Sequence, residues 1–247
     1  MRFTIIDEKL NYYFFYKKME ELKVNALEDC NFIRSITLSH GLTEIRKCAF
    51  RWCRNLETVI IPKTVTKIGP DAFSWSGLKS ITLLDGRLTE IGDYAFYMCR
   101  NLETIVIPET VTKIGPGAFW FSGLKSITLL DGRLTEIGEG AFHGCRNLET
   151  VVIPESVTKI GPGAFALSGL KSIILPYQSK GLTEIGNSSF YECCNLETVV
   201  IPETVTKIGS YAFADSGLKS ISLPDGLIEI GEDAFRDCRN LVVKYRN

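Results

Sequence analysis

The chain is dominated by one short pattern: an Ala-Phe pair that recurs about every 23 residues. The pair stands at residues 49–50, 72–73, 95–96, 118–119, 141–142, 164–165, 212–213 and 234–235, and a Ser-Phe pair replaces it at 189–190. A fixed period of this length indicates a stack of similar units, each in contact only with its neighbours. We therefore expect an elongated solenoid built from successive coils.

Each coil also opens with an apolar residue, usually leucine. The opening leucines are Leu56, Leu78, Leu102, Leu124, Leu148, Leu170, Leu196, Leu218 and Leu241. Their spacing mostly alternates between 22 and 24 residues, so the higher-order unit is a pair of coils, 46 residues long. Residues 54–99 and 100–145 differ at ten positions and are identical at 36 of 46. Near-identical repeats leave few positions individual enough to form an active site.

Two segments carry a resemblance to a known family. The openings of the type Leu-x-x-Ile-x-Ile-Pro, and the Val-Thr-Lys-Ile-Gly segments that precede Ala-Phe, resemble the BspA-like class of leucine-rich repeats over roughly residues 21–247. The resemblance implies an α/β repeat solenoid: a right-handed leucine-rich-repeat stack with one parallel β-sheet face and short helical or irregular turns on the other. It also implies a binding or adhesion module rather than an enzyme.

The residues of one coil support this fold. Alternation along residues 58–61 sends Val59 and Ile61 inward and Ile60 outward, and Pro62 ends the strand because it lacks a backbone donor. We expect residues 21–247 to form about nine coils of ~23 residues plus one degenerate N-terminal coil. Residues 1–20 are predicted to form an aromatic cap. The last strand has no comparable cap, which predicts some self-association through that edge.

Composition limits the partners. The net charge is −1, the pI is about 6.2 and no basic run occurs, which argues against nucleic-acid binding. No apolar stretch approaches the ~18 residues of a membrane span. The first residues lack the apolar core of a signal peptide, so a cytoplasmic location is expected. The alternative is a cell-surface or secreted protein whose signal was removed and replaced by a starting Met.

Catalytic signatures are missing from the sequence. It has two histidines, His40 and His143, and no phosphate loop, dinucleotide fingerprint or His-Glu-x-x-His motif. The carboxylates stand in repeating columns, each with a cationic neighbour. We expect no catalytic residue, no cofactor and no metal site.

Six of the eight cysteines occupy one position, three residues before an opening apolar residue: Cys30, Cys53, Cys99, Cys145, Cys193 and Cys238. From Cys53 onward they fall on every second coil, about 10 Å apart, whereas a disulfide needs Cα atoms within ~7 Å. Only Cys30 and Cys53, on adjacent coils, are close enough to pair. The prediction is a buried column of small residues, which fits a reducing compartment.

Two columns of charge alternate in sign from coil to coil. The first contains Arg34, Glu57, Lys79, Glu103, Lys125, Glu149, Lys171, Glu197 and Lys219; the second contains Glu44, Lys67, Glu90, Lys113, Glu136, Lys159, Glu184, Lys207 and Glu229. In-register stacking places each charge between two opposite ones. We interpret them as structural ladders, with the binding of a charged polymer as the alternative.

The candidate partner-binding residues form two groups and one outlier. The strand face contributes Thr58, Ile60, Thr82, Thr104, Val106, Thr128, Thr150 and Val152, and the aromatic edge contributes Trp52, Trp75, Trp120 and Phe121. Tyr177 lies in a segment that is two residues longer than its counterpart. The structural alternatives are that Thr suits an exposed strand and that the aromatic rings fold back onto the neighbouring coil.

Together these features predict a non-catalytic scaffold that binds a protein partner, of unknown identity, through the sheet face or the aromatic edge. The alternative is a cell-surface adhesin, or a fragment of one, that binds a host or matrix protein or a glycan. A hydrolase hidden in the repeats is the least supported of the three classes.

Overall fold

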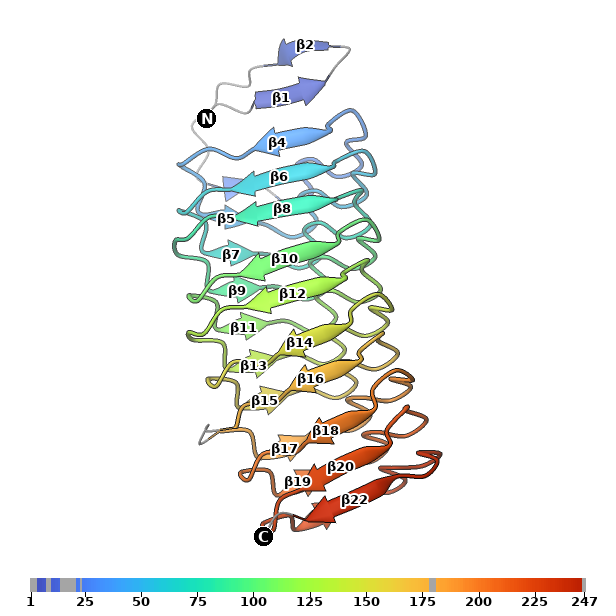
Figure 1. The fold of residues 1–247 in the computed structure, drawn as a ribbon. Coiled ribbons are helices and arrows are strands. Elements are labelled where there is room, and N and C mark those ends of the chain that lie inside the picture. Colours follow the sequence, from blue (N-terminus) through green and yellow to red (C-terminus); the bar gives the residue numbers. More distant parts are fainter. Residues whose placement is uncertain (1–3, 8–9, 14–20, 23, 178–180, 246–247) are drawn as a thin grey trace.

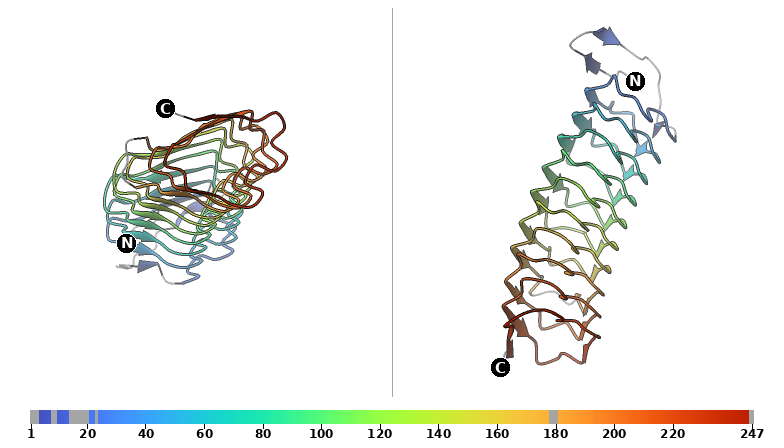
Figure 2. Two further views of the ribbon diagram at one scale, coloured as in Figure 1. Left: turned by 90° about the horizontal axis from the view of Figure 1, so that it is seen from below. Right: turned by 90° about the vertical axis from the view of Figure 1, so that its right-hand side faces the viewer.

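The computed structural model describes residues 4–7, 10–13, 21–22, 24–177 and 181–245. The chain winds into a column of stacked coils, with the two ends of the chain at opposite ends of the column (Figure 1). Each coil has a longer strand on one side, a two-residue strand on a second side and the Ala-Phe turns on the third (Figure 2). The predicted solenoid is therefore confirmed. Over the described residues, no helix of the length and apolarity that a membrane crossing requires is present.

The longer strands form what we call the strand face. Its members are β4 (Ser35–Thr37), β6 (Thr58–Ile61), β8 (Ser80–Leu83), β10 (Thr104–Ile107), β12 (Ser126–Leu129), β14 (Thr150–Val152), β16 (Ser172–Ile174), β18 (Thr198–Val200), β20 (Ser220–Leu223) and β22 (Val242–Tyr245). Neighbours that pair are parallel. Burial alternates as predicted: Val59 and Ile61 are buried and Ile60 is exposed. Branched aliphatic residues fit this half-buried, pleated surface.

The two-residue strands form a second parallel sheet, which the sequence analysis did not predict. It runs without interruption through β3 (Glu21–Leu22), β5 (Glu44–Ile45), β7 (Lys67–Ile68), β9 (Glu90–Ile91), β11 (Lys113–Ile114), β13 (Glu136–Ile137), β15 (Lys159–Ile160), β17 (Glu184–Ile185), β19 (Lys207–Ile208) and β21 (Glu229–Ile230). We call it the short-strand sheet. A glycine follows most of these strands because the preceding coil is close: a Cβ on Gly92 would lie 2.8 Å from the Gly69 carbonyl carbon.

The third side consists of irregular turns, and no helix occurs in the described part of the chain. The residues two before and two after each Phe have positive φ, for example Asp71 at 53° and Trp75 at 59°. This alternation points every second N–H along the stack. Phe50 N thus donates to Ala72 O of the next coil at 2.7 Å, while Ala49 N donates within its own coil. The turns are therefore joined by hydrogen bonds between coils, as the strands are.

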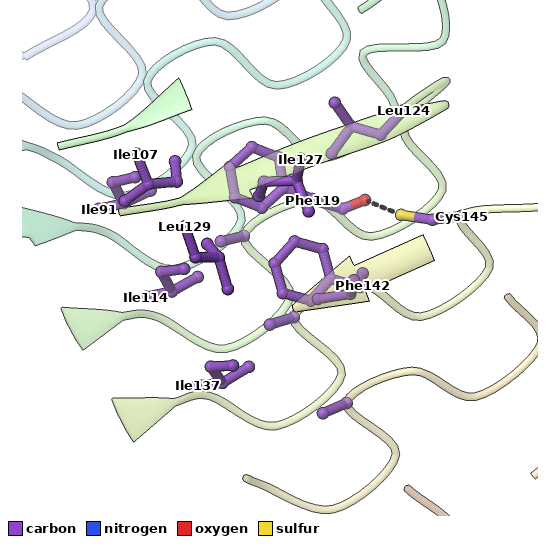
Figure 3. Close-up of a cluster of buried hydrophobic side chains, with 14 of the residues drawn as sticks. Ile91, Ile107, Ile114, Phe119, Leu124, Ile127, Leu129, Ile137, Phe142 and Cys145 are labelled. Atoms are coloured by element: carbon purple, nitrogen blue, oxygen red, sulfur yellow. Dashed lines mark hydrogen bonds between the residues drawn. The ribbon is translucent and has the colours of Figure 1, made fainter. Parts of the chain in front are cut away.

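Leucine and phenylalanine fill the interior, as predicted. Eight of the Phe rings are fully buried and stack in one column, for example Phe119 on Phe142 with centroids 5.3 Å apart and planes 3° from parallel. Figure 3 shows these two rings beside Ile114 and Ile137 of the short-strand sheet and Ile127 of the strand face. The core is thus a single apolar column enclosed by three hydrogen-bonded sides.

The corners that lead into the strand face alternate in length. Long corners carry Cys-x-Asn before the opening leucine (residues 53–55, 99–101, 145–147 and 193–195), and short corners carry Ser-Gly (76–77, 122–123, 168–169 and 216–217). A short corner has room only for glycine: a Cβ on Gly123 would lie 2.0 Å from the Arg100 carbonyl oxygen. In the long corner, Cys145 Sγ–H donates to Phe119 O at 3.1 Å and lies 3.3 Å from Ser122 Oγ.

This alternation divides the strand face into two-strand units. Within a unit the register is complete, as between β6 and β8 or β10 and β12. In the middle of the column it weakens between units: β12 and β14 share the single pair Ser126↔Thr150, and β8 and β10 belong to different sheets, as do β16 and β18. The first and last steps, β4 to β6 and β20 to β22, keep complete register across a long corner. The expectation of one regular sheet face is therefore corrected to a segmented one.

The two ends of the column differ. At the N-terminal end, β1 (Thr4–Asp7) pairs antiparallel with β2 (Leu10–Tyr13) and with β4, through Thr4↔Thr37. These strands lie where the aromatic cap was predicted, but Phe14, Phe15 and Tyr16 fall outside the described residues. At the C-terminal end, β22 pairs with β20 and has no second partner strand among the described residues.

Candidate binding surfaces

The register brings the predicted strand-face residues onto one surface. Ile60 lies beside Thr82, Val106 beside Thr128, and Val152 beside Ile174. The outward aliphatic residues are well exposed: Ile60 39%, Val106 51%, Val152 57%, Ile174 61% and Val200 45%. Thr58 is half-buried, and Thr82, Thr104, Thr128 and Thr150 are exposed. The result is a stripe of branched apolar side chains and hydroxyls along the column.

Ion pairs border this stripe, but only within the two-strand units. Lys79 Nζ lies 3.0 Å from Glu57, and Lys125 Nζ lies 2.8 Å from Glu103. Lys171 pairs with Glu149 in the same way. Among the described residues, no ion pair of this column crosses from one unit to the next. The prediction that each charge is bracketed by two opposite ones is therefore wrong for this column, because the corners offset neighbouring units.

The charge column of the short-strand sheet forms the predicted ladder in part. Glu136 lies 4.0 Å from Lys113 on one side and 3.1 Å from Lys159 on the other, and Lys207 also pairs on both sides. In the described structure no ion pair joins Glu44 to Lys67, Glu90 to Lys113, or Lys159 to Glu184. Beside this column, most of the threonine hydroxyls donate to the carbonyl of the preceding threonine, as Thr112 Oγ1 does to Thr89 O at 3.0 Å. These charges and hydroxyls form ion pairs and hydrogen bonds with the neighbouring coils, which favours their interpretation as structural residues.

The predicted aromatic residues lie on the side of the Ala-Phe turns, away from the strand face. Trp52 and Trp75 stack with centroids 4.8 Å apart, and Trp120 lies 6.1 Å from Phe121. All four are half-buried. Phe121 covers Gly144, where a Cβ would lie 2.3 Å from its ring. Rings that fold over the next coil in this way fit the structural alternative better than a free binding edge.

Tyr177 belongs to neither group. Its side chain is exposed, and its backbone N–H donates to Glu155 Oε1 at 3.0 Å. Residues 178–180, the rest of the longer segment, lie outside the described residues. The strand-face residues, the aromatic residues and Tyr177 therefore lie on different parts of the molecule and do not form one site.

Four of the six cysteines in the column are buried as predicted, and Cys30 and Cys238, at its two ends, are partly buried. All eight cysteines are free, including Cys30 and Cys53. Burial raises the pKa of Cys53, Cys99, Cys145 and Cys193 to about 12. These thiols stay protonated at neutral pH and are poor nucleophiles. The only exposed thiol is that of Cys194.

The remaining candidate for chemistry is His143, which packs against Trp120 and Phe121 with its pKa lowered by burial. Within the described residues, no group of three His, Cys, Asp or Glu side chains could hold a metal ion.

Sequence reasoning missed the hollows at the corners. One, of about 450 Å³, is lined by Arg100, Phe121, Gly123, Arg146 and Asn147. The next, of about 470 Å³, lies beyond Arg146 and also includes Lys125, Glu149, Gly169, Lys171 and Asn195. The alternation of Cys-Arg-Asn with Ser-Gly in the sequence could have indicated these hollows, because a longer corner protrudes from the column beyond a shorter one.

A solenoid of about 23-residue coils, with an inward leucine column and a parallel strand face, is a leucine-rich-repeat architecture. The profile of the BspA type leucine-rich repeat region, in six copies, matches residues 20–133 and 121–242. The chain belongs to this family. No protein of curated function matches it.

Solved structures show the same fold. The pneumococcal vaccine antigen PcpA is 24% identical, with a TM-score of 0.57 over 82% of this chain and 68% of its own. A leucine-rich cell surface protein from Faecalibacterium prausnitzii is 21% identical, with a TM-score of 0.46 over 99% of this chain and 86% of its own. A leucine-rich repeat protein from T. pallidum is 25% identical, with a TM-score of 0.45 over 85% and 78%. The match to PcpA supports the solenoid fold.

Proposed function

We propose that the protein is a non-catalytic interaction scaffold that binds a protein partner through its strand face. The observation that carries the proposal is the stripe of exposed aliphatic side chains, of which Val106, Val152 and Ile174 are each more than half exposed. Exposed apolar stripes rimmed by polar residues are typical of protein interaction sites. The stripe is rimmed by the Lys–Glu pairs of the two-strand units.

The same repetition supports a scaffold rather than an enzyme. Each polar column recurs from coil to coil, and its charges and hydroxyls have partners inside the stack. Catalysis needs a few groups held in one unusual environment, whereas binding to an extended surface benefits from repetition. Membership of a family of binding repeats agrees with this view.

The test removes the stripe without disturbing the fold. Threonine already occupies the outward position in Thr82 and Thr128, so Val106→Thr, Val152→Thr and Ile174→Thr together should be tolerated. We expect the triple variant to lose partners that the wild type retains from native lysate, at an unchanged Tm. A matched control changes Leu84→Thr and Leu130→Thr, two exposed leucines just beyond β8 and β12. Equal retention by all three proteins would contradict the proposal.

We place this scaffold in a reducing compartment because its eight cysteines are all free. Display on the cell surface as an adhesin is the alternative, and membership of the BspA-type family favours it. Protease treatment of intact cells separates the two locations. Survival of the chain until the cells are lysed supports a cytoplasmic scaffold, and its digestion on intact cells supports the adhesin.

The C-terminal edge is the second part of the proposal. Val242, Val243 and Tyr245 of β22 are exposed, and β22 has no strand on its outer side within the described residues. Such an edge is a template for pairing with another chain, so we propose dimerisation through it. Sedimentation should show a concentration-dependent dimer that Val242→Lys with Tyr245→Lys abolishes. A strict monomer at high concentration would contradict the proposed dimer.

A further inference from the structure

The alternating corners form a row of hollows along the column. The corners that lead into the strand face lie on the right-hand side of Figure 1 and face the viewer in the right panel of Figure 2. The glycine of each short corner packs directly against a backbone carbonyl of the long corner before it, as Gly123 does against Arg100 and Gly169 against Arg146. The longer corners then stand out as rims on either side of the space above each glycine.

The rims of the central hollows carry unpaired positive charge. The lysines beside them, Lys125 and Lys171, are neutralised by Glu103 and Glu149 at 2.8 Å. Arg100 and Arg146 have no carboxylate within ion-pair distance among the described residues; Arg100 contacts the Met98 sulfur at 3.9 Å. Two guanidinium groups therefore stand on successive long corners, two coils or about 10 Å apart.

The hollow between these arginines offers more than charge. The Phe121 ring forms one wall, and the Asn147 amide supplies donors and an acceptor. Its volume, about 450 Å³, lies within the range of small-ligand sites, which combine an apolar or aromatic wall with a few polar groups. Arg146 and Asn147 also line the next hollow, so one rim borders both, and we call the two hollows together the corner groove.

We propose that this groove binds an anionic polysaccharide. An acidic sugar occupies the hollow above Gly123, with its ring against Phe121 and its carboxylate or sulfate held by Arg100 and Arg146. Guanidinium groups suit this role because they bind such anions with two parallel hydrogen bonds. The neighbouring sugars extend over Gly169 toward Asn195. This site is separate from the strand face that is proposed to bind protein.

Two observations favour a polysaccharide over an acidic peptide. An extended peptide can bind by adding to a free strand edge. The open edges lie at the ends of the column, and the sheet edges inside it face each other, β8 against β10 and β16 against β18, so neither kind is offered at these corners. The wall of the hollow is an aromatic ring beside an amide. A sugar matches it, because its C–H face packs on an aromatic ring and its hydroxyl groups bond to an amide.

The groove has a natural boundary. The next long corner carries Cys194 where Arg100 and Arg146 stand, although Asn195 is retained. The first long corner has Arg54, but Glu28 and Asp29 line the hollow beside it and make it unsuitable for an anion. Toward the C-terminus the row of arginines therefore ends at Arg146, and a Cys194→Arg change would lengthen it by one position.

The test uses calorimetry with four probes: an oligogalacturonate, a dextran sulfate, neutral dextran and poly-glutamate. We expect one or both of the acidic sugars to bind and neutral dextran not to bind. The double variant Arg100→Ala with Arg146→Ala should weaken binding by about tenfold or more, because two charge-assisted contacts are lost. Arg239→Ala, at the same motif position in the last coil, is the matched control and should bind as the wild type does.

Two further variants keep the result decisive. Phe121→Leu repeats the side chain found at Leu167, which has the same positive φ, and it should weaken sugar binding at an unchanged Tm. Cys194→Arg should strengthen binding several-fold. Failure of both acidic sugars to bind, or equal losses with Arg239→Ala, would overturn the proposal. Tighter binding of poly-glutamate, insensitive to Phe121→Leu, would overturn it in favour of an acidic peptide.

Discussion

The strand face and the short-strand sheet are built from the same repeats, yet one is segmented and the other is continuous. The short-strand sheet runs through ten strands in unbroken order, whereas the strand face falls into three separate sheets. The short strands recur mostly every 23 residues, and the longer strands alternate between 22 and 24. Hydrogen-bond register is complete across steps of 22 or 23 residues and weakens at the steps of 24 to 26 residues.

The difference comes from the length of the corner. Every second coil has one more residue in its corner and one fewer residue between the opening leucine and the short strand. From Phe119 to Leu124 there are five residues, and from Phe142 to Leu148 there are six. From Leu124 to Ile137 there are thirteen, and from Leu148 to Ile160 there are twelve. The sum is 18 in both coils, so the extra corner residue is offset on the far side. The Phe column and the short strands stay in phase, and only the strand face and its corners alternate.

The largest effect should come from the continuous side. Phe142→Ala removes a fully buried ring that stacks on Phe119 and Phe165, and it should destabilise the protein by about 3–5 kcal/mol. Val152→Ala on the segmented face, where the side chain is mostly exposed, should cost less than about 0.5 kcal/mol. Urea unfolding of both variants measures the contrast. Similar losses would show that the Phe column is not the main source of stability.

Much of the stack was predictable from the sequence, but its division into a segmented and a continuous side was not. The 23-residue period predicted the stack, the inward Leu and Phe positions, and the buried cysteines. The short-strand sheet was missed because two residues are too few to show an alternation of period two. The left-handed residues beside each Phe were missed because Trp75 and Phe121 occupy positions that usually favour glycine.

The binding surfaces were predicted less completely. The outward strand positions follow from alternation, and they lie together as expected. The groove at the corners depends on how far each corner protrudes from the column, and residue types alone do not encode that. Its glycines indicated close approach, but only the coordinates show that Gly123 lies beneath the Arg100 carbonyl.

The second prediction concerns the short corners. Gly123→Ala places a Cβ 2.0 Å from the Arg100 oxygen, and because backbone must move, a loss of about 1–3 kcal/mol is expected. The matched control is Gly163→Ala. Gly163 has positive φ but no atom within 4 Å of its Cβ position, and its equivalents include Asp71 and Tyr94, so the loss should be at most about 1 kcal/mol. Thermal unfolding measures both; a larger loss at Gly163 would contradict the tight corner.

The third prediction concerns the long corners and the pH dependence of the free energy of unfolding. The buried Cys145 thiol has a pKa of about 12, against 9.0 for an unperturbed thiol. Between these values the unfolded chain loses the proton and the folded chain keeps it, so stability falls as pH rises. The contribution of one thiol is about 1.4 kcal/mol per pH unit. Cys145→Ser keeps a donor for Phe119 O and does not titrate, so its stability should fall less steeply between about pH 9 and pH 12. Cys194→Ser, at an exposed thiol, is the control and should leave the slope unchanged.

The smallest effect distinguishes contacts within a unit from contacts between units. Lys125→Glu places two glutamates together with Glu103 and should cost up to about 1 kcal/mol, since the pair is exposed. Adding Glu103→Lys restores the pair in reverse and should return stability to within about 0.5 kcal/mol of the wild type.

That recovery is expected only if charges do not interact across unit boundaries. In a continuous ladder, the reversed pair would set the new lysine at position 103 against Lys79 and the new glutamate at position 125 against Glu149, and the double variant would stay destabilised. The same reversal on the short-strand sheet, Lys113→Glu with Glu136→Lys, should not recover, because Glu136 also pairs with Lys159. Recovery on one side of the column and not on the other, measured by urea unfolding at low salt, is the expected consequence of an alternating corner in an otherwise regular stack.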